Sequence, residues 1–189
     1  MKVLLDSYST VVQNPSGGMQ VRIKQYRETL GKHGVQSELF NKWQHKITDF
    51  HVLHVFKLNI ESYHLINYAK KNKIPVVISS VVPLDSASKI LMNRFICKLL
   101  PIHTGYSFME DALALADAVI SETQQEADYI AHNFKTKKSK LYVIPCGVKF
   151  LPLRGTNNGI SHLIGDDREI VLQVGRFDQN KNQLSVVRA

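Results

Sequence analysis

Short, nearly continuous apolar segments alternate with amphipathic segments along most of this chain, and this alternation constrains the fold more than any other feature. The apolar segments cover residues 2–6, 35–40, 51–56, 74–80, 117–121 and 140–145. Their length and their lack of a polar face are typical of strands that a parallel sheet buries on both sides.

The intervening segments have helical periodicity. Met19, Ile23, Tyr26 and Leu30 recur at the spacing of one helix face, which predicts a helix over roughly residues 17–32. Further helices are expected over 61–71, over 86–116 with an interruption near Pro101, and after a Thr-Gln-Gln-Glu capping box at 123–126. Strands that alternate with helices predict an α/β fold with a Rossmann-like, doubly wound parallel sheet.

The domain organisation follows from a change of composition near the carboxyl end. Residues 150–169 are rich in Gly and Asn and indicate a linker or an exposed excursion. A new strand is expected over 170–175, and a helix is expected to start near Asn182. We therefore expect a Rossmann-like domain over 1–149, a linker over 150–169 and the beginning of a second domain over 170–189.

Charge favours an anionic partner. The chain has 24 Lys and Arg against 16 Asp and Glu, a formal net charge of +8. Nucleic acid, an acidic membrane surface and phosphorylated small molecules all fit this charge. The lysine run at 135–140 has no interleaved aromatic residues, which favours a solvated turn, so no nucleic-acid partner is expected.

The segment 86–100 leaves two interpretations open. It mixes Lys89, Arg94 and Lys98 with apolar residues at helical spacing, so it could rest on anionic lipid or pack one side against the core. No apolar stretch is long enough to cross a bilayer. Asp6 interrupts the first apolar run where a secretory signal would continue. The two cysteines show no spacing typical of a disulfide framework. We expect a cytoplasmic protein, with peripheral attachment to the inner face of the membrane as an alternative.

Two features stand where parallel strands end and ligands usually bind. Gly17 and Gly18 open the first helix, where exposed backbone amides and the helix dipole favour an anion, although a plain turn is an equal alternative. His54 lies near the end of a strand and could face the cleft or pack in the core. His51 and His54 point to opposite faces of a strand, so no metal site is expected.

Two cations follow the expected strand at 170–175. The guanidinium of Arg176 can hold a phosphate through two parallel hydrogen bonds, and Lys181 adds a point charge beside a helix start. Together they could neutralise a pyrophosphate without a metal or another cofactor. A solvated basic loop is the competing interpretation.

The order of these stretches resembles the family-4 retaining glycosyltransferases of the GT-B fold. The resemblance rests on the glycine pair, a strand with a histidine, ADAVISETQQEADYI, KLYVIPCGV and VGRFDQNKN, in that order over nearly the whole chain. It implies two Rossmann-like domains that face each other across a cleft, with a nucleotide sugar held mainly by the second.

The resemblance also implies roles for individual residues. Arg176 and Lys181 match the catalytic cations that bind the donor's diphosphate and stabilise its charge as it leaves. Gly17 and Gly18 match a loop near the donor phosphate and the acceptor, and His54 matches the strand histidine. The expected partners are therefore a nucleotide sugar and a glycan or lipid-linked, cell-envelope acceptor.

The sequence also departs from the family pattern. Val81 or a neighbour stands where many members carry a histidine, and Cys146 and Lys149 replace an Asn and an Asp. The family's E-x7-E carboxylates would lie beyond Ala189, so we expect this chain alone to be inactive. The alternative is a one-domain, non-catalytic binding module, and an open reading frame with E-x7-E after residue 189 would exclude it.

Overall fold

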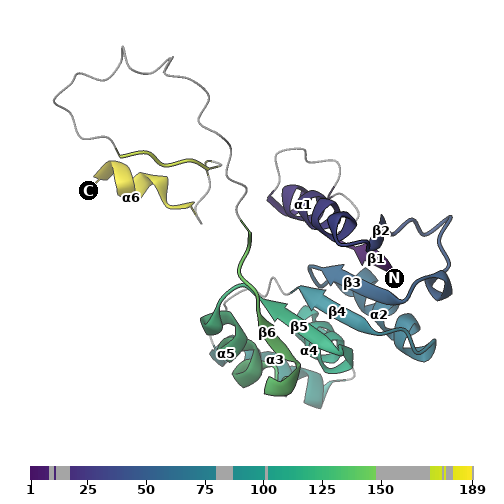
Figure 1. Cartoon of the computed structure of the whole chain (residues 1–189). Helices are drawn as coiled ribbons and strands as arrows, with labels where there is room; N and C mark the ends of the chain where they lie inside the picture. Colours follow the sequence, from purple (N-terminus) through teal and green to yellow (C-terminus); the bar gives the residue numbers. More distant parts are fainter. Residues whose placement is uncertain are drawn as a thin grey trace, which may run out of the picture. The chain divides into compact units, whose positions relative to one another are not determined.

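Six parallel strands form one sheet in the computed structural model of the chain (Figure 1). The structure describes residues 1–8, 11, 18–79, 87–100, 102–147, 171–175, 177 and 181–188. The strands are β1 (Lys2–Asp6), β2 (Gln36–Leu39), β3 (Val52–Phe56), β4 (Val76–Ser79), β5 (Ala118–Ser121) and β6 (Leu141–Val143), in the order β2-β1-β3-β4-β5-β6. The predicted α/β fold class with a doubly wound parallel sheet is confirmed.

Helices connect these strands. They are α1 (Gly18–Lys32), α2 (Ile60–Lys71), α3 (Ala87–Leu99), α4 (Gly105–Leu115) and α5 (Gln124–Asn133), with short 3-10 turns at Ile47–Asp49 and Lys138–Lys140. The helical region expected over 86–116 is divided into α3 and α4 between Leu99 and Gly105, next to Pro101. The residue Pro101 itself lies outside the described residues.

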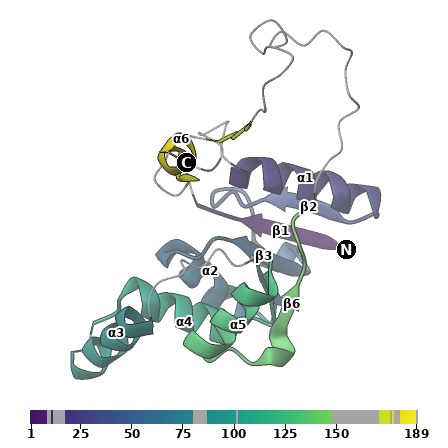
Figure 2. The ribbon, with the colours of Figure 1, turned by 90° about the vertical axis from the view of Figure 1, so that its left-hand side faces the viewer.

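The direction of each connection decides which face of the sheet its helix covers, because crossovers between parallel strands are right-handed. The chain moves one way from β1 to β2 and the other way from β3 through β6. Accordingly, α1 lies on one face, and α2, α4 and α5 pack on the opposite face with α3 against α4 (Figure 2).

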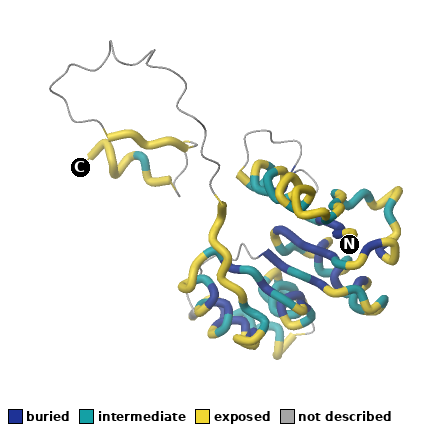
Figure 3. Tube along the Cα trace, viewed as in Figure 1, coloured by how far each residue is buried: buried dark blue, intermediate teal, exposed yellow. Residues whose placement is uncertain are grey.

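Two apolar clusters correspond to these two faces. The larger joins strand residues such as Leu53 and Ile78 to the buried sides of α2, α4 and α5, which supply Ile66, Leu113 and Ile130. The smaller joins β1 and β3 to α1 and consists of Val3, Leu5, Val11, Ile23 and Phe56. Figure 3 shows the central strands as the most buried part of this body. The continuous apolar runs of the central strands β1, β3 and β4 are thus explained by burial on both faces, whereas the edge strands β2 and β6 are partly exposed.

The helix ends are satisfied by side chains. The Thr123 hydroxyl accepts a hydrogen bond from the Glu126 backbone at 3.1 Å, as the sequence predicted. The Glu126 carboxylate, however, accepts from the backbone of Glu122 at 2.8 Å, one residue earlier than in a standard capping box. At the other end of a helix, Lys140 Nζ donates to the carbonyls of Ala114 at 2.9 Å and Ala116 at 2.7 Å, so it closes α4.

The chain divides into two compact units, Met1–Gly147 and Val148–Ala189. In the second unit, helix α6 (Gln183–Arg188) starts one residue after the expected helix start at Asn182. Residues 171–175 have no strand partner among the described residues, although a strand was expected there. Their apolar side chains are exposed, and Val174 is 85% accessible.

Candidate functional site

The strand order places a reversal of chain direction between β1 and β3. The chain leaves β1 toward β2 through α1, and it leaves β3 in the opposite direction through α2. The loops after these two strands therefore diverge, and parallel sheets of this order bind ligands in the crevice outside the carboxyl ends of the strands there. We take this edge of the first unit as the candidate site.

The amino end of α1 borders this edge. Gly18 is its first residue and is exposed, and a side chain added there would meet no described atom within 4 Å. The amides of the first helical turn have no partners within the helix, and the helix dipole makes this end positive. An anionic group can therefore approach the backbone here.

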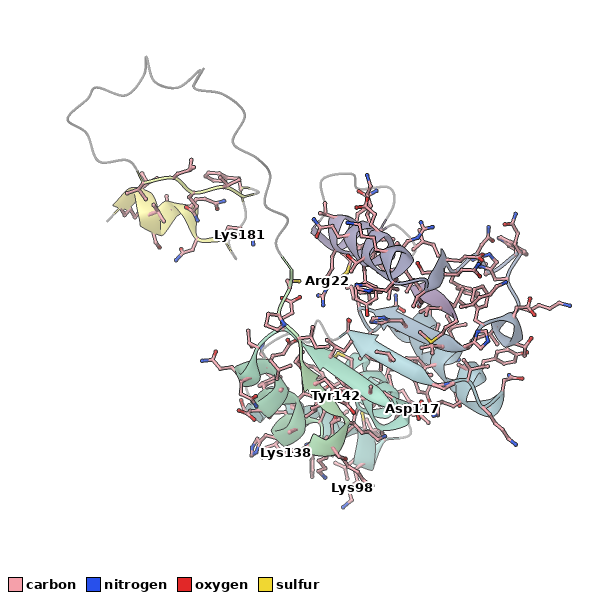
Figure 4. The ribbon with its side chains drawn as sticks, viewed as in Figure 1. Arg22, Lys98, Asp117, Lys138, Tyr142 and Lys181 are labelled. Atoms are coloured by element: carbon pink, nitrogen blue, oxygen red, sulfur yellow. The ribbon has the colours of Figure 1, made fainter. Side chains whose placement is uncertain are left out.

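Arg22 lies one turn after Gly18 and bridges to the far side of the edge. Its guanidinium forms an ion pair with the Glu122 carboxylate, which directly follows β5, and lies 5.9 Å from the centroid of the Phe56 ring (Figure 4). The Arg22 side chain is mostly buried, whereas that of Glu122 is 40% accessible. Because the pair links α1 to the end of β5, it positions the charges of the site.

Cys146 shares the same carboxylate. Its thiol is exposed and donates a hydrogen bond to Glu122 Oε1 at 3.3 Å. Partial burial and this hydrogen bond raise the pKa of the Cys146 thiol, against the opposing charge of Arg22. A thiol that stays protonated is a weak nucleophile.

His54 lies under this edge, inside the body. It is 3% exposed, stacks on Phe56 with ring centroids 4.3 Å apart, and meets the edge of Tyr26 at 4.9 Å. Its Nε2 lies 2.8 Å from the Ser79 hydroxyl at the end of β4. Burial, and then the charge of Arg22, lower the pKa of His54 to about 3, so the ring is neutral. The environment is that of a packed histidine, and contact with a ligand stays a prediction.

Asp6 ends β1 at the same edge. Burial raises the pKa of the Asp6 carboxyl to about 7, opposed by a hydrogen bond from the Ser7 backbone and reinforced by the charge of Glu61 in the first turn of α2. A carboxyl group with this pKa exchanges its proton at neutral pH, as a general acid or base must.

Two further features mark the edge. The buried Ser7 hydroxyl has no hydrogen-bond partner among the described residues. Lys57, directly after β3, has a φ of 76°, a strained value for a residue with a side chain, and its Nζ lies 4.6 Å from the Tyr8 ring centroid. Strain of this kind is often kept where function requires it.

One hollow of the first unit lies near this edge, and another lies away from it. One of about 620 Å³ is bordered by the residues after β3 and the first turn of α4, including Leu58, Asn59, Tyr106 and Phe108. A larger one of about 1250 Å³ lies between α1 and the edge strand β2. The smaller hollow opens on the carboxyl side of the sheet, where α2 and α4 begin.

The predicted site residues are divided between the units. Gly18 and His54 belong to the first unit, and Lys181 belongs to the second, where its backbone carbonyl accepts a hydrogen bond from Gln173 at 2.6 Å. Gly17 and Arg176 lie outside the described residues. The described part of the chain contains no cluster of three or more His, Cys, Asp or Glu side chains that could hold a metal.

Sequence reasoning missed Arg22, Glu122 and Asp6. Each had a positional signal: Glu122 and Asp6 stand at the carboxyl ends of predicted strands, and Arg22 follows the glycine pair by one helical turn. The pairing of Arg22 with Glu122, a hundred residues apart, was not visible in the sequence.

A comparison with models of known protein families found no match, and a comparison with curated proteins found no related sequence.

Proposed function

We propose that the unit Met1–Gly147 is the acceptor-side domain of a glycosyltransferase that moves a sugar, with retention and without a metal, from a nucleotide sugar to a glycan or lipid-linked acceptor. One observation carries the proposal: an open glycine begins α1 beside the point where the chain reverses direction across the sheet. Sheets of this order bind nucleotides and phosphates at that point. The order of sequence motifs supports the same function.

The chemistry of the edge suits a donor that leaves as a diphosphate. The positive end of α1 favours the phosphate charge that develops as the sugar is transferred. Arg22 adds a cation one turn further on, held in place by Glu122. The resemblance implies that Arg176 and Lys181 also bind a donor diphosphate.

Asp6 supplies a second element of the proposal. Sugar transfer requires the acceptor hydroxyl to lose a proton, and a carboxyl group with a pKa of about 7 can take it at neutral pH. The hollow beside Tyr106 and Phe108 offers an apolar and aromatic surface of the kind on which sugar rings pack.

Gly18→Val tests the proposal directly. A valine at Gly18 would extend into open space, so the fold should tolerate it, but it would block the approach of a ligand to the α1 amides. We expect binding of nucleoside diphosphate sugars, measured by calorimetry over a panel of bases and sugars, to weaken at least about tenfold, the loss of one or two charge-assisted hydrogen bonds.

Gly31→Val is the matched control, because Gly31 belongs to the same helix and is equally open. It should leave binding unchanged and give the same urea denaturation curve as Gly18→Val within a few tenths of a kcal/mol. Equal binding by the parent and both variants would contradict the proposal.

A further inference from the structure

Helix α3 presents an apolar face that the described residues leave uncovered. Leu91, Met92, Phe95 and Leu99 are 61%, 58%, 63% and 65% exposed, respectively. Their spacing of one, four and eight residues from Leu91 places them on one side of the helix. Large apolar side chains that gather on one exposed face indicate a binding surface.

The opposite side of α3 is fixed to the body. Ile90 is 2% exposed, and Arg94 donates two hydrogen bonds to the Glu110 carboxylate on α4 at 3.0 and 2.9 Å. Arg94 also donates to the carbonyl of Asn133 at the end of α5, and Cys97 Sγ lies 3.6 Å from the Thr104 hydroxyl. These contacts hold α3 in one rotation, with its apolar face turned outward.

Cations surround this apolar face. Lys89 and Lys98 are exposed on α3, and no Asp or Glu occurs from residue 86 to residue 109. The exposed Lys135, Lys137 and Lys138 follow Asn133, the residue whose carbonyl contacts Arg94. Figure 4 shows Lys98 and Lys138 at the same lower margin of the first unit, and Figure 2 places α3 and the turn after α5 along that margin.

We propose that α3 lies in the surface of an anionic membrane, with Leu91, Met92, Phe95 and Leu99 in the acyl boundary and the lysines among the lipid headgroups. The proposal goes beyond the proposed reaction and does not depend on it. A helix of 13 residues is about 20 Å long, less than the roughly 30 Å of a bilayer core. No helix in the described parts of the chain is long and apolar enough to span a membrane.

A membrane explains both properties of the face at once. The apolar side chains gain by leaving water, and the lysines gain by approaching anionic headgroups. A second copy of this chain is a poorer occupant, because a symmetric contact through α3 would bring the same cations together.

The test uses flotation of the whole chain with vesicles of phosphatidylcholine alone or mixed with phosphatidylglycerol. We expect binding only to the mixed vesicles. Lys89→Gln with Lys98→Gln should weaken it roughly thirtyfold, since one cation near an anionic surface contributes about fivefold. Lys32→Gln with Lys71→Gln, which removes two exposed charges from α1 and α2, is the matched control and should have little effect. Arg94 stays unchanged, because its ion pair with Glu110 is structural.

Leu91→Ser with Phe95→Ser should weaken binding about a hundredfold or more, because two large apolar side chains are lost. Trp43→Ser, at an exposed apolar residue of another loop, should not. Equal binding to both kinds of vesicle, or unchanged binding by the serine variant, would overturn the proposal. So would a dimer in lipid-free solution that the serine substitutions abolish, since a second copy would then cover the face.

A fluorescent reporter keeps the test independent of the serine variants. Trp43 is the chain's one tryptophan, so Trp43→Phe with Phe95→Trp places a single indole on the apolar face of α3. Its emission should shift to shorter wavelength on anionic vesicles and be quenched by brominated acyl chains. Binding to the vesicles without quenching would contradict insertion of α3.

Discussion

Asp6→Asn should stabilise the protein at alkaline pH and leave its stability unchanged at acidic pH. Burial raises the pKa of Asp6 from 3.8 to about 7 in the folded chain, so the folded state binds this proton more tightly than the unfolded state. When folding raises the pKa of an acid, the protein loses stability as the pH rises from the unfolded pKa to the folded pKa. The acid causes no change of stability outside that pH window. Asparagine has nearly the same shape, keeps an acceptor for the Ser7 amide and never ionises.

The magnitude follows from the shift of about three pKa units. At 1.36 kcal/mol for each unit, the charge of Asp6 costs at most about 4 kcal/mol once it is fully ionised above pH 7. The free energy of unfolding of Asp6→Asn should therefore equal that of the parent at about pH 3, below both pKa values, and exceed it by up to about 4 kcal/mol at about pH 8. Urea denaturation followed by circular dichroism at three or more pH values measures both chains.

The comparison must use the difference between variant and parent. The pKa of His54, lowered from 6.5 to about 3 by burial and by Arg22, gives the parent an opposing dependence, because stability falls as pH drops through that range. This contribution is common to both chains and cancels. An equal effect of Asp6→Asn at both ends of the pH range, or a destabilisation at about pH 8, would refute the assignment of Asp6 as a buried acid.

Asp117→Asn is a control of opposite sign. Partial burial raises the pKa of Asp117, but hydrogen bonds from Lys70 Nζ and the Val76 backbone, with the charges of Lys70 and Lys140, outweigh it and lower the pKa below 3.8. Its stabilisation is present above the unfolded pKa and lost as pH falls. Asp117→Asn should therefore destabilise by about 1 kcal/mol at neutral pH, a modest value because the pair is half exposed, and less at acidic pH.

Three further outcomes are expected. Ile66→Ala should lower the free energy of unfolding by about 2–5 kcal/mol in urea denaturation, because Ile66 is fully buried. The same change at Ile60, an exposed residue of the same helix, should lower it much less. Equal losses would contradict the assignment of Ile66 to the core. Lys140→Met should lower stability by about 1 kcal/mol through loss of its two carbonyl contacts, whereas Lys138→Met should not, and indistinguishable melting curves would argue against the cap. Glu122→Gln should speed alkylation of Cys146 by iodoacetamide. Burial raises the pKa of that thiol and the Glu122 carboxylate raises it further, so the substitution should lower the pKa. An unchanged rate, measured with Cys97 as the internal reference, would show that Glu122 does not control the pKa of Cys146.

The strands and the helices that alternate with them could be predicted from sequence, because both depend on local periodicity. The continuous apolar run of β1 gave its bounds directly, and the fold class followed from the alternation. The segment 171–175 has the same pattern but no strand partner among the described residues. An apolar run predicts a strand only where neighbouring strands are available to complete the ladder.

The candidate site was harder to predict because its contacts are long-range. The Arg22–Glu122 pair joins α1 to the end of β5, and nothing local in either segment announces the other. The pKa of Asp6 depends on burial, and Asp6 reads in the sequence as an ordinary acidic strand end. Lys140 was placed in a solvated lysine run, whereas the fold brings it to the carbonyls that end α4.

The most direct test of the account is a map of amide chemical shifts for the isotope-labelled chain titrated with nucleotide sugars and then with oligosaccharides. If the edge where β1 and β3 diverge is the ligand site, the changes will concentrate at Gly18, Arg22, Lys57 and Glu122 and will disappear in Gly18→Val. Changes confined to the hollow between α1 and β2, or changes that persist undiminished in the valine variant, would contradict it.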